Sequence, residues 1–132
     1  MRSGMDASFS FQIDRSRDLV RIKMSGLFTP ADIAAFLEGR RKAHAELGCA
    51  PNRHITLNDV RDMKIQSQEI VVAFREMLSD PAYRSRRLAF VAAPTLARGQ
   101  LLRALQEREA RCFDSIEAAE AWLFAEERSE AA

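Results

Sequence analysis

The 132-residue chain has little of what several classes of protein require. It contains five glycines and no GxGxxG or Walker motif, which leaves little material for a phosphate-binding loop. It also lacks the HExxH motif of zinc proteases and the nucleophile elbow of hydrolases. The longest apolar run, residues 88–93, is far shorter than the roughly 20 residues of a membrane span. Residues 1–10 hold no apolar stretch, so we expect no secretory signal and a cytoplasmic protein.

The sequence also lacks an excess of charge of either sign. Twenty basic residues face nineteen acidic ones, for a net charge of +1, which gives no overall attraction to nucleic acid or to anionic lipid. The single tryptophan and single tyrosine leave few positions on which bases could stack. We therefore predict no nucleic-acid partner and no membrane span.

Cysteine and histidine are scarce, with two of each. Cys49 and Cys112 lie far apart, in no CxxC or metal-ligand spacing, so we expect two free thiols, with Cys112 in the core. His44 and His54 have no paired nucleophile in the sequence, and structural roles explain them. The prediction is no catalytic residue, no metal and no cofactor.

Alternating apolar and polar residues predict strands, and helical spacing predicts the segments between them. The predicted strands cover 9–14, 20–25, 54–58, 88–93 and 111–113. Polar residues 15–18 make the first two a hairpin, and the fourth strand is apolar on both faces and so central. The predicted helices follow Thr29, Ser67, Thr95 and Ser115 as caps, with Gly48 just after the end of the first. Inward-facing positions are expected at Ile33, Phe36, Leu37 and Leu47 in the first helix and at Leu101, Leu102 and Leu105 in the third.

The order ββαβαβαβα predicts one α/β domain with a five-stranded, mostly parallel sheet, because helical crossovers join parallel strands. The alternation suggests that the polar side chains of the first three strands share one uncovered face, so helices should lie mainly on the other. Those polar residues are Ser10, Gln12, Arg21, Lys23, Thr56 and Asn58. The expected core includes Phe11, Ile22, Phe36, Leu57, Phe74, Phe90, Leu102 and Trp122. The domain should cover 9–125, between flexible segments at 1–8 and 126–132.

A polar loop is expected at 58–67, after the third strand, where partners and ligands of α/β sheets usually approach. The residues expected to face a partner are Asp59, Arg61, Asp62, Lys64, Gln66 and Glu69. A solvated turn with local ion pairs is the alternative. Ser67 suits an N-cap worth about 1 kcal/mol, and a phosphate there would meet the positive end of a helix dipole, so a phosphorylation switch is the other interpretation.

Arginines concentrate in the second half of the chain. Arg84, Arg86, Arg87 and Arg98 could form a patch that binds an anionic ligand or an acidic partner. A charged surface with internal pairing is the alternative.

The element order over residues 9–125, together with the loop from Ile65 to Ile70, resembles the STAS family (sulfate transporter and anti-sigma-factor antagonist), and in particular its SpoIIAA-like branch of small bacterial proteins. In regulatory members the loop reads Asp-Ser-Ser/Thr-Gly-Leu and a kinase phosphorylates a serine. Ser67 matches that serine and Ile70 the leucine, while Gln66 and Glu69 stand in place of Asp and Gly.

The resemblance implies a non-enzymatic regulatory module that binds a protein partner through the loop after the third strand. A small carrier of a lipid or other apolar ligand is the alternative, and an enzyme of unrecognised type is the third. An uncovered strand face and an open sheet edge also favour a homodimer.

Overall fold

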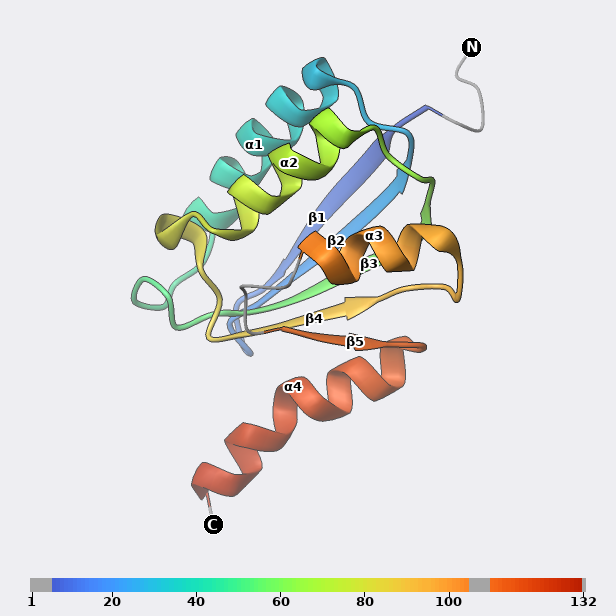
Figure 1. Ribbon diagram of the computed structural model, residues 1–132. Coiled ribbons are helices and arrows are strands. Elements are labelled where there is room, and N and C mark those ends of the chain that lie inside the picture. Colours follow the sequence, from blue (N-terminus) through green and yellow to red (C-terminus); the bar gives the residue numbers. More distant parts are fainter. Residues whose placement is uncertain (1–5, 105–109, 132) are drawn as a thin grey trace.

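The computed structural model describes residues 6–104 and 110–131, and its centre is a five-stranded sheet (Figure 1). The strands are β1 (Ser8–Asp14), β2 (Leu19–Gly26), β3 (Ile55–Met63), β4 (Arg87–Val91) and β5 (Arg111–Phe113). They lie in the order β1-β2-β3-β4-β5, with β1 antiparallel to β2 and all later pairs parallel. Helical crossovers between β2 and β5 therefore give the parallel part of the sheet, as predicted.

Three helices lie on one face of the sheet and the fourth lies on the other (Figure 1). The first three are α1 (Pro30–Ala45), α2 (Gln68–Leu78) and α3 (Leu96–Ala104), and α4 (Ile116–Ala131) covers β3, β4 and β5 from the opposite side. A short 3₁₀ helix, η1 (Pro81–Tyr83), joins α2 to β4. The predicted α/β class, element order and one-sided bias of the helices are confirmed.

Polar caps fix where three of the helices begin. Thr29 and Asp32 form a reciprocal capping box at α1, in which the Thr29 hydroxyl accepts from the Asp32 amide. The Ser67 side chain accepts from the Ile70 amide at α2, and that of Ser115 from the Ala118 amide at α4. The predicted caps at these helices are confirmed.

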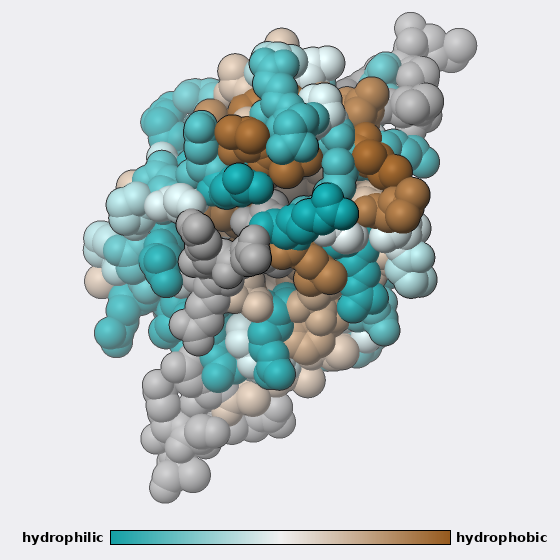
Figure 2. All heavy atoms as spheres, viewed as in Figure 1, coloured by the Kyte–Doolittle hydropathy of each residue, from teal (hydrophilic) through white to brown (hydrophobic). Residues whose placement is uncertain are grey.

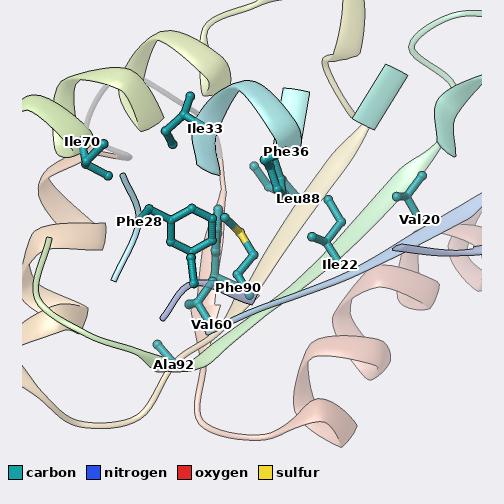
Figure 3. Close-up of a cluster of buried hydrophobic side chains, with 12 residues drawn as sticks. Val20, Ile22, Phe28, Ile33, Phe36, Val60, Ile70, Leu88, Phe90 and Ala92 are labelled. Carbon is teal, nitrogen blue, oxygen red and sulfur yellow. The ribbon is translucent and has the colours of Figure 1, made fainter. Parts of the chain in front are cut away.

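Each face of the sheet has its own hydrophobic core. On the side of α1, α2 and α3, apolar residues of β2, β3 and β4 meet Phe28, Ile33, Phe36 and Ile70 (Figure 3). On the other side, Ala119 and Leu123 of α4 pack against Leu19, Ile55, Leu57, Ala89 and Val91. Leu88 to Val91 alternate between the two cores, which explains why β4 is apolar on both faces.

The structure corrects several expectations about which way side chains point. Thr56 and Asn58 do not share a face with Arg21 and Lys23, because Ile55 and Leu57 are the β3 residues that pack on the α4 side. Both are instead buried beneath α1, α2 and α3. Leu37 and Leu102, both expected inside, are 37% and 48% exposed. The expectation for Leu105 falls outside the described residues.

Some element limits also differ from the prediction. β3 continues to Met63, since pairing with β2 through Asp62 and Met63 carries the strand into the expected loop. α1 ends with Glu46 as its C-cap, before Gly48. α4 is helical to Ala131, past position 125. The limits of the domain itself stay a prediction.

Candidate functional site

A cavity of about 120 Å³ lies between the sheet and helices α1, α2 and α3. Its walls are mostly apolar and include Ile22, Phe36, Phe74, Leu88 and Phe90. Polar side chains of α1, α3, β3 and of the connections that flank α2 and precede α3 also line it. A mostly apolar surface with polar side chains among the lining residues is typical of small-molecule sites in proteins.

Arg40 is the charged group of this cavity, and it is only 9% exposed. Its guanidinium donates to the Met77 carbonyl oxygen at 3.1 Å and lies 3.5 Å from an Asp80 carboxylate oxygen. The Tyr83 ring stacks on it at 4.1 Å, a cation–π contact. Burial lowers the pKa of Arg40, and the nearby Asp80 opposes that shift. These contacts hold the cation in one orientation at the cavity wall.

Two histidines and two hydroxyls lie beside Arg40. The His44 ring packs edge-on against His54 and Tyr83, at 4.8 and 5.0 Å between ring centroids. His44 Nδ1–H donates to the Arg40 carbonyl oxygen at 2.9 Å. Ser85 Oγ lies 2.6 Å from Thr56 Oγ1 and 3.3 Å from His54 Nε2. The histidines expected to be structural thus pack against each other, with His44 half-buried and bonded to the α1 backbone and His54 buried beside Ser85. The sequence did not indicate this arrangement.

Two buried polar atoms of cavity-lining residues have no hydrogen-bond partner among the described residues. They are Arg40 Nε, a donor, and Asn58 Oδ1, an acceptor. A buried polar atom left without a partner costs about 1–3 kcal/mol. Such atoms are rare, and a ligand or water is the usual reason for them.

We expect the free energy of unfolding to fall as the pH drops from about 7 towards 5, partly because of His44. Burial lowers the pKa of His44 in the folded protein, and the Arg40 charge adds to this, against the backbone hydrogen bond. The unfolded chain therefore binds more protons once the pH falls below the ordinary value of 6.5, and folding weakens. Urea unfolding at several pH values would measure it. His44→Gln should flatten the curve, and equal slopes for both proteins would contradict the assignment.

Gln66 also lines the cavity, and its side chain links the β2–α1 connection to the β3–α2 connection by hydrogen bonds. Its side-chain oxygen accepts from the Phe28 amide at 2.8 Å, and its Nε2 donates to the Gly26 and Lys64 carbonyl oxygens. Its own backbone exchanges two hydrogen bonds with the Gln100 side chain of α3. Gln66 is 7% exposed, so its side chain does not face a partner as expected.

The other residues of the predicted loop are divided between strand and surface. Asp59 lies within β3, is buried, and receives two hydrogen bonds from Arg61 at 2.9 and 2.8 Å. Burial raises the pKa of Asp59, but the bonds from Arg61 outweigh it and the net shift is downward. The Asp59 carboxylate is therefore already engaged. Exposed positions of the predicted set are Arg61, Asp62, Lys64, Ser67 and Glu69.

Apolar side chains adjoin these exposed positions. Leu27 is 37% exposed in the β2–α1 connection and Ile65 is 50% exposed in the β3–α2 connection. Figure 2 shows hydrophobic side chains gathered where these two connections lie. Because parallel strands end together, the connections meet at one edge of the sheet, where α2 begins.

Of the four arginines expected to form an anion patch, Arg84 and Arg98 line the cavity from opposite ends of β4, whereas Arg86 and Arg87 do not line it. Arg84 precedes β4 and Arg98 follows it, with the Arg98 guanidinium 3.1 Å from Asp114. Arg87 lies over the Trp122 ring and donates to the Trp122 carbonyl oxygen. Arg86 donates to the Arg53 carbonyl oxygen. These positions fit the alternative of a charged surface with internal pairing.

Within residues 6–104 and 110–131, no three His, Cys, Asp or Glu side chains are placed to hold a metal ion. No helix in those ranges is long and apolar enough to cross a membrane. Cys49 and Cys112 are free and partly buried, and burial raises the pKa of both thiols.

Sequence reasoning missed Arg40, although a signal for it existed. Ile33, Phe36, Arg40 and Ala43 are the buried residues of α1, at helical spacing. An arginine in the middle of an apolar stripe indicates a buried charge with a fixed partner. The prediction instead placed the side chain of Leu37, one position from that stripe, in the core.

Comparison with known proteins gives a likeness among solved structures. No family model and no curated protein matches the chain. Among solved structures, it resembles the 2.25 Å crystal structure of an uncharacterized DUF3478-family protein with a SpoIIAA-like fold from Shewanella loihica PV-4. The TM-score is 0.69 at 18% sequence identity, over 93% of this chain and 99% of that one. The chain therefore has a SpoIIAA-like fold, as its resemblance to the STAS family implied.

Proposed function

We propose that this protein is a non-enzymatic, cytoplasmic regulatory module that binds a protein partner at the sheet edge where β2 and β3 end. The observation that carries the proposal is the patch formed by Leu27 and Ile65 together with the exposed polar residues Arg61, Lys64 and Ser67. An apolar centre with a charged rim is the usual composition of a protein interface. Gln66 holds the backbone beneath this patch in one conformation.

The test is recovery of a partner from native cell extract with variants of the patch. Ile65→Asp should abolish recovery, because it places a charge at the centre of the apolar surface. The matched control is Leu37→Asp, an exposed apolar residue in the middle of α1, which should leave recovery unchanged. Ser67→Ala should cost about 1 kcal/mol of stability as a lost cap. If Ser67 is a switch, Ser67→Asp should change partner recovery without loss of stability. Equal recovery with Ile65→Asp and wild type would refute the interface.

A second function, binding of a small apolar ligand, is favoured by a separate observation. The cavity beneath α1, α2 and α3 is apolar but has a volume of only about 120 Å³. Small-molecule pockets for larger ligands have about 300–1,000 Å³, so a long lipid chain does not fit. The ligand of such a carrier or sensor would be a small molecule. A homodimer stays a prediction.

A further inference from the structure

We propose that two copies of this chain associate through β1, with the two β1 strands paired antiparallel about Phe11 so that both sheets join into one. β1 lies at one end of the strand order, and within the described residues β2 is its only strand neighbour (Figure 1). The outer edge of β1 therefore carries backbone groups with no strand beside them. This surface is separate from the patch around Leu27 and Ile65, and the proposal does not rest on that patch.

β1 lacks the features with which proteins protect a sheet edge. Exposed edges are usually short, or they carry a lysine, a proline or a β-bulge. The opposite edge strand, β5, has only three residues, whereas β1 has seven and contains neither lysine nor proline. Its register with β2 is continuous from Ser8 to Asp14. Asp14 is its only charged residue, and that carboxylate accepts hydrogen bonds from Ser16 in the turn. An edge of this length and regularity favours pairing with a further strand.

Backbone hydrogen bonds of β2 indicate which groups of β1 point outward. The carbonyl oxygens of Asp18 and Gly26, at the two ends of β2, accept from amides on the β3 side. Successive residues of a strand direct their backbone groups to opposite sides, so the odd-numbered residues of β2 face β1 and bond to its even-numbered residues. The odd-numbered residues of β1 therefore direct their N–H and C=O groups away from the sheet, and these are Phe9, Phe11 and Ile13.

The sequence of β1 is complementary to itself in one antiparallel register. With Phe11 opposite Phe11 of the second copy, all seven residues have a partner of similar polarity and no like charges face each other. A shift by two positions in one direction would place Asp14 opposite Asp6, and a shift in the other direction leaves part of β1 unpaired. The pairs in the favoured register are Phe9 with Ile13, Ser10 with Gln12, and Ser8 with Asp14.

Pairing also covers apolar side chains that are only partly buried in a single chain. Phe9, Phe11 and Ile13 pack against the core beneath α1 and keep part of their surface exposed. The centroids of the Phe9 and Phe11 rings lie 5.3 and 5.2 Å from that of Phe36. In the dimer, Phe11 meets Phe11 of the second copy and Phe9 meets Ile13. Aromatic and β-branched pairs of this kind stabilise antiparallel strands.

α1 leaves room for a second copy beside β1. It packs over β1, where a Cβ atom at Gly39 would come 2.8 Å from Cε2 of Phe11. Ala35 lies one turn before Gly39 on the same side of the helix, and it is exposed. Because both residues are small, the α1 helices of two copies can approach each other above the paired strands.

The first test uses the wild-type protein. Sedimentation velocity at submillimolar concentration should give twice the chain mass of 14.9 kDa. On dilution, the amides of Phe9, Phe11 and Ile13 should exchange hydrogen faster, because the second copy is their hydrogen-bond partner. The amides of Ser10 and Gln12 bond to β2 and should stay protected. The mass of a single chain at millimolar concentration, or the same response to dilution in both sets of amides, would overturn the proposal.

Two double variants test the register, because positions 10 and 12 face each other across the interface. Ser10→Glu with Gln12→Glu places carboxylates opposite carboxylates in the dimer. Within one chain the same positions face Lys23 and Arg21, so the fold of the single chain is kept. Ser10→Glu with Gln12→Lys instead places opposite charges across the interface. We expect the dissociation constant of the first variant to exceed that of the second about tenfold or more, and the difference to shrink at high salt.

The control for specificity is Ile65→Asp, in the proposed partner patch. It should leave the mass of the dimer unchanged, because Ile65 lies in the β3–α2 connection and not on β1. Thermal unfolding confirms that each variant is folded. Equal dissociation constants for the two double variants contradict the register about Phe11. Dissociation caused by Ile65→Asp would place the self-association at the patch, and it would likewise overturn the proposal.

Discussion

Leu123→Ala is expected to lower the free energy of unfolding by about 2–5 kcal/mol, because it leaves a cavity in the core between α4 and the sheet. Leu123 is fully buried, and α4 is the helix that covers that face of β3, β4 and β5. Few neighbouring side chains could move to fill the space, because Ala119 and Ala89 are small. Urea unfolding followed by circular dichroism would measure the change.

The matched control is Leu102→Ala, the same substitution in another helix. Leu102 is 48% exposed on α3, so its truncation should change stability by less than about 0.5 kcal/mol. Comparable losses for the two variants would show that Leu102 is buried, as the sequence had suggested, and would contradict the described packing of α3.

Gln66→Ala is expected to cost about 1–3 kcal/mol, since it leaves the buried Phe28 amide without its partner and removes one of the two hydrogen bonds to the Gly26 carbonyl oxygen. Gln66→Glu should also be costly, because a carboxylate still accepts from Phe28 but cannot donate to two carbonyl oxygens. Its effect should be smaller at low pH, where a protonated carboxyl regains one donor. Urea unfolding at pH 7 and pH 4 would compare the two.

The control for this residue is Gln68→Ala, two positions further on. Gln68 is exposed in the first turn of α2, and its replacement should leave stability nearly unchanged. If Gln66→Ala lowers the free energy of unfolding by less than about 1 kcal/mol, the prediction is contradicted, and water molecules then replace the hydrogen bonds of Gln66.

Strong local patterns predicted most of the fold. The alternation in β1 and β2 and the caps at Thr29, Ser67 and Ser115 each act within a few residues, so a sequence displays them directly. Period-two alternation says which residues of one strand share a face, but it does not say which face that is. For this reason Thr56 and Asn58 were placed on the wrong side of the sheet.

The candidate site was harder to predict because long-range packing creates it. The cavity brings Arg40 of α1, Asn58 of β3 and the residues around Tyr83 together from distant parts of the chain. Gln66 looked like a loop residue beside Ser67, and only its contacts with Phe28 and Gln100 make it internal. Long-range contacts also set the C-terminal limit of β3, because its pairing with β2 continues through the polar residue Asp62 to Met63.

The order of the strands in the sheet is also their order in the chain, and this has a consequence for synthesis on the ribosome. Each strand that emerges finds its neighbour already present, so the sheet can grow from β1 to β5 without waiting for a distant segment. The face that α4 covers behaves differently. Leu19, Ile55, Leu57 and Val91 remain uncovered until α4, which follows all five strands, has left the ribosome. The nascent chain is therefore most prone to aggregate late in translation, after the sheet has formed and before its last helix has docked.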